Sequence, residues 1–152
     1  MSGTQKPGDE MIGLLALTVA ALYSGAALYV NLVEKPALLA LHPQDSLAGW
    51  QIALRRGALI QPPLVTVGFL LGLVAWIETH SAGYMIGALL MLAGIPWTIV
   101  AILPINKSLG AAVPADVAGA ASSALLQDWY MRHAVRTALG LLALIAFLVA
   151  LL

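Results

Sequence analysis

The sequence has no cysteine and very little charge. Without cysteine it forms no disulfide, thiolate metal site, iron–sulfur cluster or cysteine nucleophile. Charged residues make up 9% of the chain, and seven basic residues balance seven acidic ones, so the composition argues against a nucleic-acid partner. Glu-x-x-His and His-x-x-x-His spacings and a phosphate-binding glycine loop are also missing. These absences predict no metal site and no nucleotide site.

Apolar residues dominate what is present. They make up 61% of the 152 residues, and the mean hydropathy is +0.94, which is typical of an integral membrane protein. A transmembrane helix needs about 20 apolar residues, and the four expected spans are 11–33, 57–77, 83–103 and 133–152. The first is longer than a signal-peptide core and lacks a clear cleavage site, so we interpret it as a retained helix. We expect an all-α, integral membrane four-helix bundle in the lipid bilayer, with 1–152 as a single domain.

The lengths of the connections predict an up-down-up-down order. Residues 78–82 alone join the second and third spans, which must therefore be antiparallel neighbours. The other two connections, 35–56 and 104–132, are much longer and lie on the opposite face.

Each long connection is expected to contain a helix. Asp45-Ser46 resembles an N-cap and precedes Trp50, which indicates a short interfacial helix after the first span. Pro114 and Asp116 resemble the start of a helical extension that runs into the fourth span.

Prolines are expected to set the helix ends. Pro36 should end the first helix and Pro104 the third, because proline lacks a backbone donor and disfavours helix in the preceding residue. Pro62-Pro63 should bend the second helix just after Gln61 and free backbone carbonyls.

The distribution of lysine and arginine predicts the orientation. The side with both termini has Lys6 alone, whereas the long-loop side has Lys35, Arg55, Arg56, Lys107, Arg132 and Arg136. The positive-inside rule then places the long loops in the cytoplasm and both termini outside, in a multi-pass protein of the cell membrane.

Small residues at helical spacing predict close helix packing. Gly68-x-x-x-Gly72 and Gly83-x-x-x-Gly87, with Ala21 and Gly25 on the first helix, would allow close approach. Packing within one chain is favoured over a dimer interface, and a homo-oligomer is left open.

The fourth helix presents one face of chemically useful side chains. Trp129, His133, Arg136 and Gly140 fall at i, i+4, i+7 and i+11. The alternative is that Trp129 and Arg136 are interfacial anchors and that a neighbour satisfies His133.

Polar residues on the other helices fall at the same expected helix ends. On the first helix, Asn31 lies inside the apolar boundary, where an amide needs a partner. Glu34 is explained equally well by an ion pair with an arginine, and Thr98 by a hydrogen bond to its own backbone. Arg55 is expected at the same end of the bundle. The predicted site residues are Asn31, Glu34, Arg56, Gln61, Thr98, Asn106, Trp129, His133 and Arg136.

The motifs together resemble the anthrone oxygenase family. They are Asn31-Leu-Val-Glu-Lys-Pro, Trp50 with Arg55-Arg-Gly and Gln61-Pro, Pro96-Trp-Thr with Pro104-Ile-Asn, and Trp129-x-x-x-His133-x-x-Arg136. The resemblance implies a four-helix membrane protein whose characterised relatives oxidise anthrones to anthraquinones with dioxygen and without a recognised metal or flavin.

The resemblance also implies roles for these side chains. His133 would be the base, since an unperturbed imidazole pKa of about 6.5 suits proton transfer at neutral pH. Arg136 or Arg56 would stabilise the oxyanion, Asn31 and Asn106 would orient the substrate, and Trp129 would stack on it.

Two alternatives stay open at this point. The same cluster could hold a haem or a quinone in a redox protein, although a bis-histidine haem would have to pair His133 with His42 from a loop. A small membrane subunit without chemistry would use the cluster as a structural network. The predicted partner is a hydrophobic small molecule, and the predicted cofactor is none, with haem as the alternative.

Overall fold

The computed structural model describes residues 7–112 and 120–152, and these form four long helical rods. The elements are α1 Pro7–Tyr29, the π-helix η1 Val30–Glu34, α2 Lys35–Leu39, α3 Pro43–Thr79, α4 Ala82–Trp97, the π-helix η2 Thr98–Ile102, α5 Leu103–Ala111 and α6 Ala120–Leu151. The first rod is α1-η1-α2, the second α3, the third α4-η2-α5 and the fourth α6. Each rod is long and apolar enough to span a membrane, so the predicted all-α membrane bundle is confirmed.

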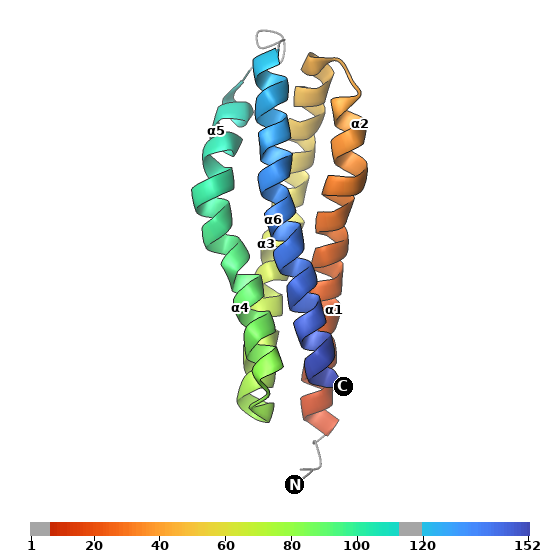
Figure 1. Ribbon diagram of the computed structural model, residues 1–152, viewed down its shortest axis with the longest axis vertical. Coiled ribbons are helices and arrows are strands. Elements are labelled where there is room, and N and C mark those ends of the chain that lie inside the picture. Colours follow the sequence, from red (N-terminus) through yellow and green to blue (C-terminus); the bar gives the residue numbers. More distant parts are fainter. Residues whose placement is uncertain (1–6, 113–119) are drawn as a thin grey trace.

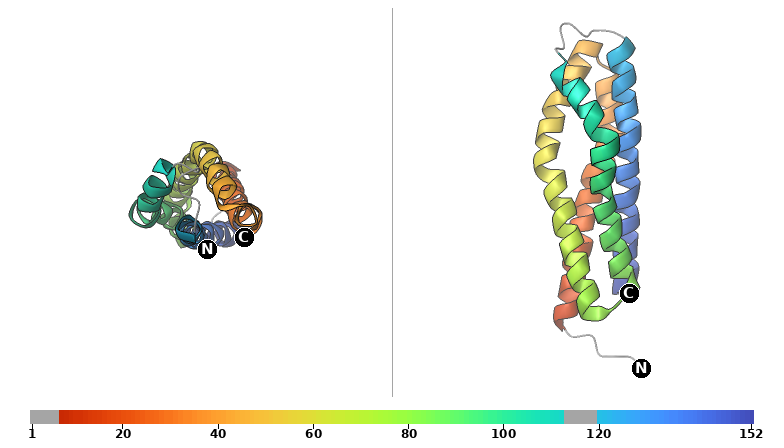
Figure 2. Two further views of the ribbon diagram at one scale, coloured as in Figure 1. Left: turned by 90° about the horizontal axis from the view of Figure 1, so that it is seen from above. Right: turned by 90° about the vertical axis from the view of Figure 1, so that its left-hand side faces the viewer.

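The rods run up, down, up and down (Figure 1). α1 and α4 each pack against both α3 and α6. In the view along the bundle the four rods enclose a common centre (Figure 2). Only His80 and Ser81 separate α3 from α4, so the predicted antiparallel neighbours are confirmed.

The prolines widen the helices and do not end them, which corrects the sequence-based boundaries. Helix continues through Pro36 to Leu39 and through Pro104 to Ala111. A proline ring collides with the carbonyl four residues earlier, and η1 and η2 lie just before these two prolines. A π turn is a local widening of this kind, so the chain passes each proline without leaving the helix.

The interfacial helix is likewise part of a longer element. The segment around Trp50 is helical as predicted, but it forms the first turns of the 37-residue α3. The N-cap is His42 and not Asp45-Ser46, because Pro43 takes the first helical position, where no backbone donor is needed. The helix before the fourth span is present from Ala120, whereas the predicted start at Pro114 and Asp116 lies outside the described residues.

Glycines and alanines set the distances between rods. The ring of Phe147 on α6 fills the space left by Gly72 on α3 and Gly87 on α4, where an added Cβ would overlap it. Ala21 and Gly25 are exposed, so their predicted role in packing within one chain is wrong. The small residues of α1 that pack inward lie on the opposite face: Ala16, Ala20 and Ala27 are fully buried.

The bundle interior has two apolar clusters with a polar layer between them. One cluster surrounds Tyr23, Tyr84 and Phe147, and the other surrounds Trp50, Trp129 and Tyr130. Along the helices, the buried polar residues Ser24, Gln61, His133 and Thr137 lie between the two. The polar groups therefore lie within the rods and not at helix ends, because all four rods extend past the boundaries predicted for them.

Candidate functional site

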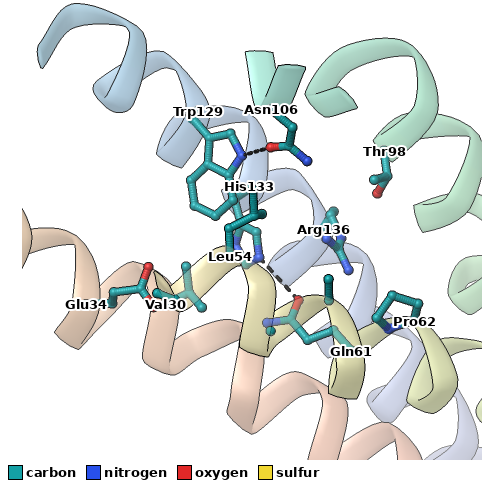
Figure 3. Close-up of a pocket in the computed structure, with 13 residues that line it drawn as sticks. Val30, Glu34, Leu54, Gln61, Pro62, Thr98, Asn106, Trp129, His133 and Arg136 are labelled. Carbon is teal, nitrogen blue, oxygen red and sulfur yellow. Dashed lines mark hydrogen bonds between the residues drawn. The ribbon is translucent and has the colours of Figure 1, made fainter. Parts of the chain in front are cut away.

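His133 lies at the centre of the polar layer and contacts side chains from two other rods. It projects from α6, is 1% exposed, and has both ring nitrogens within hydrogen-bonding distance of a carboxamide. Asn31 of η1 approaches Nδ1 at 3.2 Å, and Gln61 of α3 approaches Nε2 at 3.4 Å (Figure 3). Two carboxamides from different helices therefore fix the ring orientation.

The Asn31 carboxamide links the first rod to α6. Its nitrogen Nδ2 donates to the Thr137 hydroxyl at 2.6 Å and lies 3.3 Å from the Ala27 carbonyl. With the amide in this orientation, Nδ1 of the imidazole is the acceptor and Nε2 carries the hydrogen. The Nε2 hydrogen then points toward the Gln61 oxygen.

Trp129 covers one face of the histidine. The two rings stack with centroids 5.1 Å apart and planes inclined by 24°. The indole nitrogen donates to the Asn106 oxygen of α5 at 2.6 Å, and Trp50 packs edge-on against the indole at 5.5 Å. Trp129 thus has its position fixed on both sides before any ligand binds.

A cavity of about 140 Å³ opens beside this cluster. Figure 3 shows side chains from all four rods around it. Its polar lining comes from Glu34, Gln61, Thr98, Asn106, Trp129, His133 and Arg136, and its apolar lining from Val30, Ala53, Leu54, Gly57, Ala58 and Pro62. A concave apolar site with a few converging polar groups is typical of a small-molecule pocket.

Arg136 brings a positive charge to the cavity wall and forms no ion pair with any described carboxylate, including Glu34 on the same cavity. Its guanidinium carbon lies 5.9 Å from the centre of the Tyr23 ring, within cation–π range, and its buried Nε has no hydrogen-bond partner. Over residues 7–112 and 120–152 the one ion pair joins Arg132 to Asp128 at 2.9 Å. The cavity can therefore stabilise an anion.

Glu34 does not form the ion pair considered from the sequence. Its carboxylate lines the cavity and accepts a hydrogen bond from the Tyr130 hydroxyl at 3.2 Å. A phenol and not an arginine therefore binds Glu34. Arg55 and Arg56 are exposed, and Arg136 lines the same cavity but forms no ion pair with Glu34.

A comparison with family models matches residues 50–146 to the anthrone oxygenase model, which covers more than half of the chain. The chain belongs to the anthrone oxygenase family. No curated protein and no solved structure matches it. The matched range includes the cavity residues of α3, α5 and α6, whereas Asn31 and Glu34 precede it.

Eight of the nine residues predicted for this anthrone oxygenase family member meet at the cluster. Seven of them line the cavity, and Asn31, which is not in the lining, lies within hydrogen-bonding distance of His133 Nδ1. Arg56 is the exception, since it is exposed and absent from the cavity lining. Thr98 lines the cavity, but its hydroxyl donates to the Gly94 carbonyl of its own helix at 2.7 Å, as the backbone alternative predicted.

Two residues of the cluster were missed from the sequence. Thr137 follows His133 by four residues, so the helical face that revealed Trp129 and Arg136 could also have revealed it. Tyr130 binds Glu34 across helices, a pairing that no spacing in the sequence indicates. His42, the second histidine of the haem alternative, is exposed and does not line the cavity.

Proposed function

We propose that this protein is a membrane-embedded, cofactor-independent oxygenase that acts on a flat hydrophobic phenol or anthrone with dioxygen. Membership of the anthrone oxygenase family supports the reaction class. The observation that carries the proposal is a buried His133 at the wall of a cavity that is also lined by Arg136, which forms no ion pair within the described residues. A proton acceptor beside a fixed positive charge is what the formation of a carbanion requires.

The reaction uses only substrate, dioxygen and proton transfer. Removal of a methylene proton from an anthrone gives an electron-rich anion with its charge on the ring oxygen. This anion passes one electron to dioxygen, and the carbon radical and superoxide combine to form a peroxide. Protonation of the peroxide and loss of water leave a second ring carbonyl, so one oxygen atom enters the product and the other becomes water.

His133 is the base in this proposal, and the two carboxamides allow it. Neutral histidine with hydrogen on Nε2 presents a donor toward Gln61. A carboxamide has a donor on one side and an acceptor on the other. Half a turn of the Asn31 amide places its oxygen on Nδ1 and moves the hydrogen to that nitrogen. The Nε2 lone pair then accepts the substrate proton once the Gln61 oxygen, which faces Nε2 in the structure, has turned away from it. Thr137 can follow this change, because a hydroxyl both donates and accepts.

Arg136 and Asn106 complete the proposed chemistry. The Arg136 guanidinium lies on the cavity wall and would stabilise the charge that develops on the substrate oxygen. Asn106 lines the same wall and uses its oxygen for Trp129, which leaves its amide hydrogens for the substrate.

The test measures anthrone oxidation by protein reconstituted in lipid, with spontaneous oxidation subtracted from a protein-free sample. Labelled dioxygen should place one labelled atom in the product. Substitution His133→Gln should lower the enzymatic rate by about 100-fold or more, since a general base contributes this much, while the exposed Gln127→Ala on the same helix should leave the rate unchanged. An unchanged rate for His133→Gln would refute the base assignment. If Glu34→Gln abolishes turnover instead, the carboxylate is the base.

The same preparation separates the redox-protein alternative from the oxygenase. A Soret band in protein purified from its native membrane would replace the proposal with a haem protein. A copurified quinone without turnover would replace it with a quinone-binding protein.

We also propose that the end of the bundle at which α2 meets α3 faces the cytoplasm. Five of the seven lysines and arginines lie in the half of the bundle toward that end: Lys35, Arg55, Arg56, Lys107 and Arg132. The positive-inside rule supports this orientation.

A further inference from the structure

We infer that a second cavity between α3 and α4 is the bilayer-facing half of the binding site, through which a flat hydrophobic substrate enters from lipid. This inference rests on the proposed function. The cavity has a volume of about 130 Å³ and is lined by Pro62, Val65, Gly94, Ile95, Thr98, Ile99 and Arg136. Apart from Thr98 and Arg136, every lining residue is apolar or glycine.

The two cavities meet at three residues. Pro62, Thr98 and Arg136 line both of them, so Arg136 lies at the boundary between the polar cluster and the apolar cavity. A molecule that passed from the second cavity to the first would reach His133 only beyond the guanidinium.

Their sizes indicate that a fused-ring substrate needs both. A cavity of about 150 Å³ in another protein holds one benzene ring, and the His133 cavity has about 140 Å³. One ring of an anthrone fills it, and the remaining rings must extend into neighbouring space. The second cavity, of about 130 Å³, offers apolar space of that kind next to the first.

The outer surface at this level is one that lipid covers. Leu59 on α3 is 77% exposed and Val100 on η2 is 76% exposed, and Ile99, which lines the second cavity, is 56% exposed. Large aliphatic side chains at this exposure on candidate membrane spans face acyl chains and not water. Because anthrones partition into lipid, an opening here would admit substrate from its reservoir.

Gly94 keeps the second cavity open. A Cβ built on Gly94 meets only the Tyr23 hydroxyl at 3.9 Å, so the backbone tolerates a side chain that would project into this space. By contrast, the glycines that space the rods, such as Gly72, have no room for one. Gly57 offers the equivalent position in the His133 cavity, with nothing within 4 Å.

These glycines allow a matched test in lipid nanodiscs. Three variants are compared with the natural chain: Gly94→Leu fills the second cavity, Gly57→Leu fills the first, and the exposed Gly25→Leu is the control, since its Cβ also meets nothing within 4 Å. Binding is measured by energy transfer from tryptophan to anthracene, a three-ring probe that does not react, and by equilibrium dialysis of phenol, a one-ring probe.

We expect Gly94→Leu to weaken anthracene binding at least tenfold and to leave equilibrium binding of phenol unchanged, while Gly57→Leu weakens both. Gly25→Leu should bind both probes like the natural chain. If Gly94→Leu does not fold, Ile99→Trp on the exposed rim should slow anthracene association instead. Anthracene binding by Gly94→Leu and Ile99→Trp that matches the natural chain in affinity and rate would overturn the inference.

The experiment separates this inference from the proposed function. If the natural chain binds anthracene, loses that binding in Gly94→Leu, and oxidises no anthrone, the oxygenase proposal fails and the bilayer-facing site stands. If the natural chain oxidises anthrones and Gly94→Leu does so at the same rate and affinity, the oxygenase stands and the entrance proposal fails.

Discussion

A double-mutant cycle on Asn31 and Thr137 tests whether the polar layer holds the bundle together as well as positioning His133. The Asn31 amide donates to the Thr137 hydroxyl at 2.6 Å between two rods, and it also contacts His133 at 3.2 Å. Asn31→Leu removes both links and leaves Nδ1 of a buried imidazole unsatisfied. The expected loss is about 2 kcal/mol in the free energy of unfolding, from the cost of an unpaired buried group and the modest strength of interhelical hydrogen bonds in membranes.

The coupling free energy between Asn31 and Thr137 tests their hydrogen bond more directly than either single loss does. Thr137→Val should cost about 1 kcal/mol, and the double variant should cost less than the two losses added together, by about 0.6 to 1.7 kcal/mol. Unfolding would be followed by tryptophan fluorescence during titration of mixed micelles with denaturing detergent.

Thr98→Val provides the control for this cycle. Its hydroxyl donates within its own helix, to the Gly94 carbonyl at 2.7 Å, so its coupling with Asn31→Leu should be zero within error. A coupling for Thr137 that is no larger than the coupling for Thr98 would refute the network described here.

The remaining predictions concern packing and topology. Gly87→Leu should destabilise the bundle by about 1–3 kcal/mol, because the new side chain overlaps Phe147. Adding Phe147→Ala should recover part of this loss. Thermal melts that show equal stability for Gly87→Leu and the exposed Gly25→Leu would contradict the packing. Because the chain has no cysteine, His80→Cys and His42→Cys each introduce one exposed thiol at opposite ends of α3. With the cytoplasmic orientation proposed above, an impermeant thiol reagent added to intact cells should label His80→Cys and spare His42→Cys, and the reverse pattern would invert the topology.

Hydrophobicity and periodicity were sufficient to predict most of the architecture. The four spans follow from the high cost of leaving backbone groups unpaired in lipid, and this rule does not depend on details of packing. Helical spacing likewise placed Trp129, His133 and Arg136 on one face, because one element fixes their relation. All three line the cavity.

Boundaries and partners between helices could not be predicted in the same way. Pro36 and Pro104 were predicted to end their helices because a proline ring collides with the carbonyl four residues earlier in a regular α-helix. The sequence does not show that a π turn before each proline relieves this collision. Arg56 was predicted as a site residue because it is charged and lies near the predicted start of the second span. It is in fact well inside α3, which begins at Pro43, and its side chain is exposed. The hydrogen bond between Tyr130 and Glu34 depends on how two rods are rotated, which no single segment encodes.

The two π turns have a consequence for how such a pocket could diversify. A π turn accommodates one more residue than a regular helical turn. Removing a single residue between Val30 and Glu34 would close this wide turn into a regular one and leave the helix on both sides in register, but it would remove the local geometry that presents Asn31 to His133. Natural length variation of one amino acid at this point would therefore reshape the chemistry of the site more than most replacements of a side chain.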